Sequence, residues 1–181
     1  MSTNSLIVVI VVAAVVVLAL TALLWTLSRR RHHLRERFGP EYERTVEEQG
    51  DKRSAERDLR AREERHDRLD IKELSPDRRQ QYADEWAGVQ QQFVDRPEGS
   101  VAGADELVTR LMGELGYPTE GYENQLRDLS VEHGRTLEEY RAAHAAKVRS
   151  DAGQATTEEL RGAMVHYRTL FEELLADQRS R

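Results

Sequence analysis

The feature that most constrains this chain is an uncharged apolar run near its N-terminus, Leu6 to Leu27, which reads LIVVIVVAAVVVLALTALLWTL. As a helix, these 22 residues span roughly 33 Å at about 1.5 Å per residue, close to the hydrocarbon thickness of a bilayer, about 30 Å. In water the valines favour a strand. In lipid an open strand leaves backbone groups unpaired, whereas a helix pairs them internally. The run therefore predicts a transmembrane helix that contacts membrane lipid.

Two alternatives explain the run less well. A buried element of a soluble protein is usually much shorter. A cleaved signal peptide would need a basic start, a shorter apolar stretch and an A-x-A-like site before Ser28, and the sequence has none of these. We therefore expect an uncleaved, single-pass anchor.

The residues that flank the run set its predicted orientation. Arginines follow it and no basic side chain precedes it, so the positive-inside rule predicts a cytoplasmic C-terminal part. Residues 1–5 become a short extracytoplasmic N-terminus at the cell membrane. The arginines are also expected to attract anionic lipid. The predicted membrane-interface residues are Trp25, Arg29, Arg30, Arg31, Arg35 and Arg37.

Charge of both signs dominates the next segment. Residues 29–68 carry 13 Lys and Arg against 11 Asp and Glu, with few apolar positions. Gly39-Pro40 should end or bend the membrane helix, and oppositely charged i,i+4 pairs favour helix beyond it. These pairs are Glu48 with Lys52, Glu56 with Arg60, Asp58 with Arg62, and Glu64 with Arg68. We predict a basic juxtamembrane segment and a solvated helical stalk over residues 28–74, frayed near Gly50, with a weak coiled coil as the alternative.

Apolar side chains recur at helical spacing in the rest of the chain. Ser75-Pro76 predicts a helix start, Asp95 the next N-cap, and Thr156 with Glu159 a capping box. Helices are expected after these caps, over about 120–126, and from about Val131 to Val148. In the last helix the stripe is Leu160, Met164, Tyr167, Phe171 and Leu174. The predicted fold is all-α, with a small antiparallel bundle over residues 75–176 and a tail over 177–181.

Several kinds of chemistry find no support in the residues. The chain has no cysteine, which excludes disulfides and thiolate sites. Residues 69–181 carry 14 Lys and Arg against 22 Asp and Glu, the opposite of the balance that binds nucleic acid. The histidines are dispersed, and a packed core role is favoured for His144 and a non-catalytic one for His166. No catalytic, cofactor or metal site is predicted.

Two further segments are FGPEYERTVEEQGDKRSAERDLRAREERHDRLDI, Phe38 to Ile71, and AMVHYRTLFEELL, Ala163 to Leu175. Both resemble segments of a family of uncharacterised actinobacterial single-pass membrane proteins. The resemblance implies a membrane-anchored protein and no known activity.

An anchor, a charged spacer and a small bundle without recognisable chemistry favour a binding or scaffold protein. We expect a protein partner and no nucleic acid. The alternatives are a structural protein that forms homo-oligomers and an enzyme whose site the sequence does not reveal. A contiguous apolar patch would favour the first class, and a pocket lined by convergent polar groups would favour the enzyme.

Overall fold

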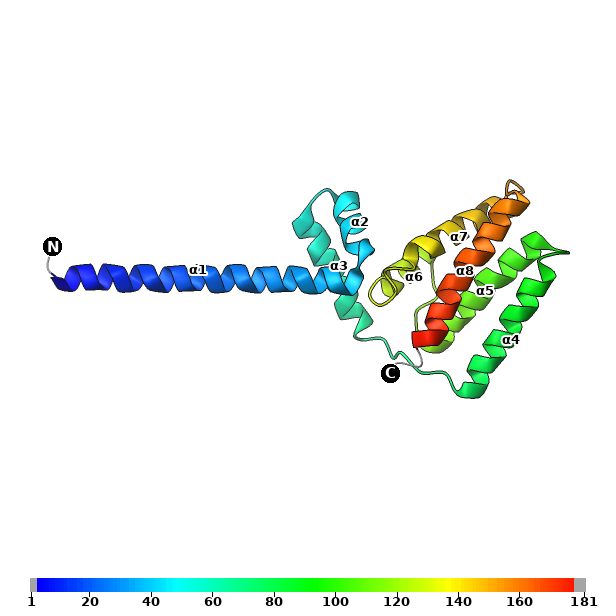
Figure 1. The fold of residues 1–181 in the computed structure, drawn as a ribbon, viewed down its shortest axis with the longest axis horizontal. Coiled ribbons are helices and arrows are strands. Elements are labelled where there is room, and N and C mark those ends of the chain that lie inside the picture. The colour runs from blue at the N-terminus through cyan, green and yellow to red at the C-terminus, as the bar shows by residue number, and fades with distance from the viewer. Residues whose placement is uncertain (1–2, 178–181) are drawn as a thin grey trace.

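The computed structural model describes residues 3–177, without the side chains of residues 3–15 and of positions 19, 23, 24, 27, 30 and 177. Within this range the chain forms eight helices and no strand, so the all-α prediction is confirmed. One long helix projects away from the rest of the molecule (Figure 1). The helices are α1 (Thr3–Phe38), α2 (Pro40–Gln49), α3 (Lys52–His66), α4 (Pro76–Gln92), α5 (Pro97–Leu115), α6 (Tyr122–Leu129), α7 (Leu137–Asp151) and α8 (Thr157–Asp177).

Helix α1 contains the whole segment from Leu6 to Leu27 and ends at Phe38. Gly39 follows with a φ of 54°, a left-handed value that breaks the helix, and Pro40 starts the next one, as predicted. No helix among the described residues is long and apolar enough to cross a membrane. Most side chains of the predicted transmembrane segment, and nearly all of the predicted tail, lie outside the described residues.

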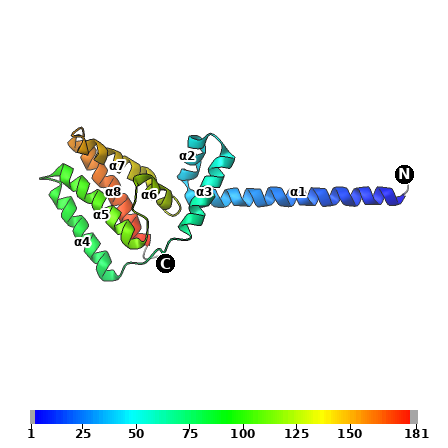
Figure 2. The same ribbon diagram turned by 180° about the vertical axis from the view of Figure 1, so that it is seen from behind.

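Helices α2 and α3 form a tight hairpin across the C-terminal end of α1 (Figures 1 and 2). Gly50 ends α2 in a left-handed conformation, and its N–H donates to the Val46 carbonyl oxygen at 3.0 Å. Asp51 then caps α3, since its carboxylate accepts from the backbone N–H of Ser54 at 2.9 Å. The break predicted near Gly50 is thus a two-residue turn that reverses the chain.

The hairpin and α1 share a small apolar core, which we call the joint core. It consists of Leu34, Phe38, Tyr42, Leu59 and Val131, all of them almost fully buried. The expectation that the charged segment buries little is therefore wrong for Tyr42 and Leu59. Their spacing along the sequence forms no stripe, and only the turn brings them together.

Ion pairs on the hairpin follow the predicted i,i+4 pattern in part. Glu56 lies 3.7 Å from Arg60, and Asp58 lies 2.6 Å from Arg62. Glu48 instead pairs with Arg44, at 2.8 Å, because Lys52 lies beyond the turn. The predicted domain boundaries stay predictions.

Close backbone contact fixes the joint core against the connection between α6 and α7. A Cβ atom at Gly134 would lie only 2.3 Å from the Phe38 carbonyl oxygen. Glycine is therefore required where this connection crosses the end of α1. The connection also supplies Val131, so residues 131–136, predicted to be helical, form instead an irregular segment, and α7 starts at Leu137.

Helices α4 to α8 form the bundle, which confirms the predicted helical bundle. Helix α5 packs against α4 and α8, and α7 packs along α8 (Figure 2). Ser75 caps α4 as predicted, and Gly116 ends α5. The N-cap predicted at Asp95 is wrong, because Arg96 holds that position without a side-chain hydrogen bond and Pro97 opens α5.

The last helix carries the central part of the bundle core. Its capping box is confirmed, because Thr156 N–H donates to the Glu159 carboxylate at 2.8 Å. Its whole predicted stripe is buried, and the Phe171 ring stacks on Trp86 at a centroid distance of 4.8 Å. This face of α8 is therefore core and not a free docking surface.

Candidate functional site

The predicted membrane-interface residues start at Trp25. This residue is 58% exposed, and the guanidinium of Arg29, one turn on, lies 3.9 Å from the centroid of its ring. This is the geometry of a cation–π contact. The side chain of Arg30 lies outside the described residues.

The remaining predicted arginines face acidic side chains of the hairpin. Arg31 lies 3.3 Å from Glu56, and Arg35 lies 3.1 Å from Glu43. Two basic side chains share Glu63: Arg37 at 3.4 Å and His33 at 2.7 Å. These contacts tie α1 to α2 and α3. They also reduce the positive charge left to attract anionic lipid.

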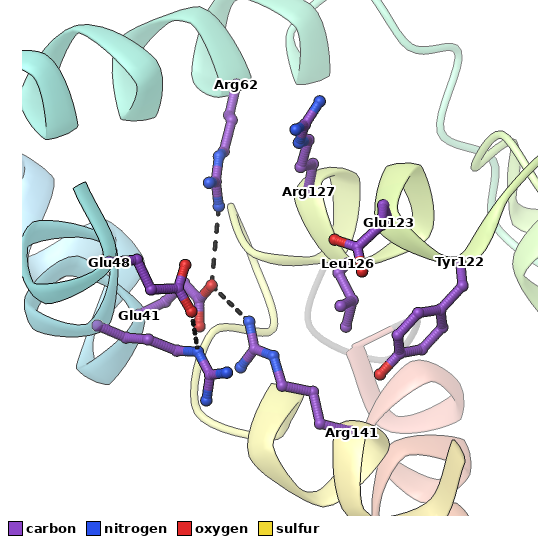
Figure 3. A pocket seen from close by; sticks show the side chains of 9 residues that line it. Glu41, Glu48, Arg62, Tyr122, Glu123, Leu126, Arg127 and Arg141 are labelled. Atoms are coloured by element: carbon purple, nitrogen blue, oxygen red, sulfur yellow. Dashed lines mark hydrogen bonds and ion pairs between the residues drawn. The ribbon is translucent and has the colours of Figure 1, made fainter. Parts of the chain in front are cut away.

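A polar pocket lies between the hairpin and the bundle. Its volume is about 350 Å³, and side chains from α2, α3, α6 and α7 line it (Figure 3). The sequence did not predict this pocket, because its walls come from segments about 80 residues apart. The lining residues are Glu41, Arg44, Glu48, Arg62, Tyr122, Glu123, Leu126, Arg127 and Arg141.

Glu41 is the centre of this pocket and is only 4% exposed. Arg141 Nη2 donates to its carboxylate at 2.6 Å, and Arg62 Nη1 lies 3.7 Å away on the other side (Figure 3). Burial alone would lower the pKa of Arg141, but the hydrogen bond to Glu41 outweighs it, so that this pKa lies above its ordinary value. Arg141 therefore stays charged, and its hydrogen bond to Glu41 links α2 to α7.

At the mouth of the pocket, a second arginine also pairs with carboxylates. Arg44 donates through Nε to Glu48 and through Nη1 to Glu138, both at 2.8 Å. A phosphate or carboxylate ligand would have to compete with these carboxylates for the arginines. The arrangement thus fits an electrostatic contact between two parts of the chain better than a ligand trap.

The histidines singled out in the sequence have packing partners. His144 stacks on Tyr122 at a centroid distance of 3.7 Å, and His166 bonds to Glu139 on α7. Among the described residues, no cluster of histidine and carboxylate side chains is arranged to hold a metal ion.

An apolar groove lies on the bundle between the end of α4 and α8. Phe93, Met164 and the 58% exposed Val165 line it, and its volume is about 200 Å³. Small-molecule sites usually exceed about 300 Å³, so this groove is too small to suggest one.

Comparisons with known proteins add no relative. No family model, curated protein or solved structure matches the chain. The resemblance to actinobacterial single-pass membrane proteins stays a prediction.

Proposed function

We propose that this protein is a membrane-anchored scaffold, in which α1 spans the cell membrane and the joint core holds a cytoplasmic bundle in a defined orientation beside it. The observation that carries the proposal is the burial of Leu34 and Phe38, at the end of α1, in the joint core. A membrane anchor that is part of a folded core fixes both the position and the orientation of the bundle at the membrane. A flexible tether would only keep the bundle near the membrane.

The surface of α1 supports the membrane part of the proposal. Its described apolar side chains Val16, Val17, Leu18 and Leu20 are all at least half exposed. Apolar surface of this extent is stable in lipid and costly in water. The hydroxyl of Thr21 donates to the carbonyl oxygens of Val17 and Leu18, at 3.0 and 2.9 Å, which satisfies it without water.

Geometry supports the role of a spacer. Leu34, the first residue of the joint core, follows Leu27 by seven helical residues, and the end of α1 follows Leu27 by eleven. At about 1.5 Å per residue, these positions are roughly 10 Å and roughly 16 Å beyond the apolar run. The bundle would then stand clear of the lipid headgroups. A partner in the cytoplasm could reach it there.

Two experiments test this function. Protease added to intact spheroplasts should spare the bundle and cut it only after lysis, and digestion before lysis would contradict the orientation. Proximity labelling from the C-terminus, with a variant lacking residues 1–28 as control, should capture a membrane-adjacent protein partner only with the anchor present. Capture of the chain itself alone would favour the homo-oligomer.

A further inference from the structure

A second pocket lies where the hairpin crosses α1, and we call it the α1–α3 pocket. Its volume is about 340 Å³. Its walls are formed by Arg29, His33 and Leu34 of α1 and by Arg60 and Glu63 of α3. Leu34 is 1% exposed and belongs to the joint core, so the pocket combines basic side chains with an apolar wall.

The position of the α1–α3 pocket along α1 follows from helix geometry. Arg29 comes two residues after Leu27 and His33 comes six, which puts them roughly 3 Å and roughly 9 Å beyond the apolar run at about 1.5 Å per residue. With α1 across the membrane, as proposed above and as this inference requires, the hydrocarbon ends near Leu27. The headgroup layer extends about 5–8 Å further. The pocket therefore opens at the depth of the lipid phosphates.

Arg29 supplies positive charge from the α1 side of the pocket. It makes no ion pair with a carboxylate among the described side chains. Its guanidinium lies over the exposed ring of Trp25, a contact that leaves the edge of the guanidinium, where its N–H donors lie, open to other groups. Arg29 can therefore donate to an anion at the membrane surface.

Arg60 supplies positive charge from the α3 side. Its carboxylate neighbour among the described side chains is Glu56, at 3.7 Å, which is too far for a hydrogen bond. Glu56 already accepts a hydrogen bond from the Tyr42 hydroxyl at 3.0 Å, and it lies 3.3 Å from Arg31. Most of the hydrogen-bonding capacity of Arg60 is therefore available to a ligand.

Glu63 is the acidic side chain in the wall of the pocket, and basic groups already surround it. Arg37 Nε lies 3.4 Å from its carboxylate, and His33 Nε2 lies 2.7 Å from it. Arginine is always protonated, so Arg37 offsets the charge of Glu63. Glu64, the next residue, is exposed and does not line the pocket. The charge that an anion would meet is therefore that of the arginines.

The two sides of α3 differ in how their arginines are paired. The hairpin lies between the bundle and the apolar part of α1 (Figures 1 and 2). On the side of the bundle, Arg62 lies 3.7 Å from the buried Glu41. Arg65 lies 3.1 Å from Asp128 of α6. Arg60, on the side of α1, has no such partner from the bundle among the described residues, and a ligand from the membrane fits this position.

We propose that the α1–α3 pocket binds the phosphate of an anionic phospholipid, with Arg29 and Arg60 as the donors from the two helices. Arginine matches phosphate oxygens with paired hydrogen bonds. A zwitterionic lipid carries a cation beside its phosphate, and the two arginines repel that cation. A free phosphate ion shares the chemistry, but the depth of the pocket favours the lipid. The bound lipid would hold the hairpin against the membrane surface.

The test uses the full chain in phosphatidylcholine vesicles and the fluorescence of Trp25. The chain has two tryptophans, and the other, Trp86, is buried in the bundle core and adds a constant background. Lipids brominated near the top of their acyl chains quench a neighbouring tryptophan. Brominated phosphatidylglycerol and brominated phosphatidylcholine are compared at equal mole fractions. We expect phosphatidylglycerol to bind beside Trp25 with at least about fivefold higher affinity, the ratio that one basic side chain contributes near a membrane surface.

Variants identify the groups responsible. Arg29→Gln and Arg60→Gln should each lower the affinity ratio at least about twofold, and the double variant should bring it to about one. Use of a ratio cancels any change in the intrinsic emission of Trp25. Arg57→Gln is the matched control, because Arg57 is exposed on the same helix and lies outside the pocket. It should keep the ratio of the original chain.

The outcomes separate this site from the anchor. Equal quenching by the two brominated lipids would overturn the site and leave the anchor intact. An absence of Trp25 quenching by either lipid would contradict the anchor, and the site with it. Equal losses in Arg57→Gln and Arg60→Gln would show a diffuse attraction of the hairpin and would also overturn the site. Excess inorganic phosphate at constant ionic strength should leave the ratio unchanged, and its loss there would assign the pocket to free phosphate instead.

Discussion

The bundle core and the joint core both hold helices together, but different kinds of side chain surround the apolar residues of the two cores. The bundle core is extensive and is built from apolar stripes on long helices, and it includes Trp86 stacked on Phe171. The joint core has five apolar side chains, and charged helices surround it. Among the residues whose side chains the structure describes, all buried polar ones except Ser100 lie in the hairpin, in α6 or in the connection that follows it. A short apolar core can hold two parts of a chain together when hydrogen bonds and ion pairs satisfy the polar groups around it.

The largest effect is expected from Phe171→Ala, in the bundle core. The change removes a buried ring and should lower the free energy of unfolding by about 3–5 kcal/mol. Chemical denaturation of the full chain in detergent, followed by circular dichroism, measures it. Val165→Ala on the exposed face of the same helix is the control, with an expected change within about 0.5 kcal/mol. Equal effects of the two changes would show that the stripe is not core.

Phe38→Ala tests the joint core in the same way. Its effect should stay local, because the ring packs on the hairpin and Val131 and not on the bundle core. A loss of about 3 kcal/mol of stabilising free energy would unfold a core as small as the joint core. Trypsin should then cut at the arginines of α2 and α3 much sooner, while the bundle resists as before. If the bundle is cleaved equally fast, the two cores are one cooperative unit.

The bundle was predictable because its apolar residues repeat at helical spacing and its caps at Ser75 and Thr156 are local signals. The joint core was not. Tyr42 and Leu59 are isolated apolar residues in a charged segment, and their partner Val131 lies more than 70 positions further on. The predicted arginines at the end of α1 could be found from the sequence, but their partners Glu56 and Glu63 depend on the turn at Gly50, whose direction no local pattern gives.

Glu41→Gln weakens the polar contact between the hairpin and the bundle while keeping the shape of the side chain. Arg141 loses a charged acceptor, and the expected cost is about 1–3 kcal/mol in the free energy of unfolding. Combination with Arg141→Gln should show a coupling of about 0.5–3 kcal/mol, since the two groups share one hydrogen bond. Glu47→Gln, exposed on the same helix, is the control. Additive effects of the two changes would mean that the pair contributes nothing to stability.

The smallest effect concerns an ion pair inside the bundle, between α4 and α5. Arg78 donates to Glu114 at 2.8 Å, and this bond lowers the pKa of Glu114 to about 2. A lowered pKa in the folded state stabilises it above the ordinary carboxyl pKa, and the stabilisation is lost as the pH falls toward about 2. Glu114→Gln should therefore cost up to about 1 kcal/mol at neutral pH and progressively less below about pH 4. A difference that stays constant down to about pH 2 would contradict the assignment.

Hydrogen exchange of the backbone amides of residues 40–66, in the full chain in nanodiscs, tests whether the hairpin is packed on the end of α1. A hairpin packed on the end of α1 should protect the amides of α2 and α3 well beyond an isolated helix, with the strongest protection around Tyr42 and Leu59, because their exchange requires the joint core to open. A solvated stalk would exchange like a fraying helix, without a protected centre. Exchange of that second kind would contradict the account of a bundle fixed to its anchor.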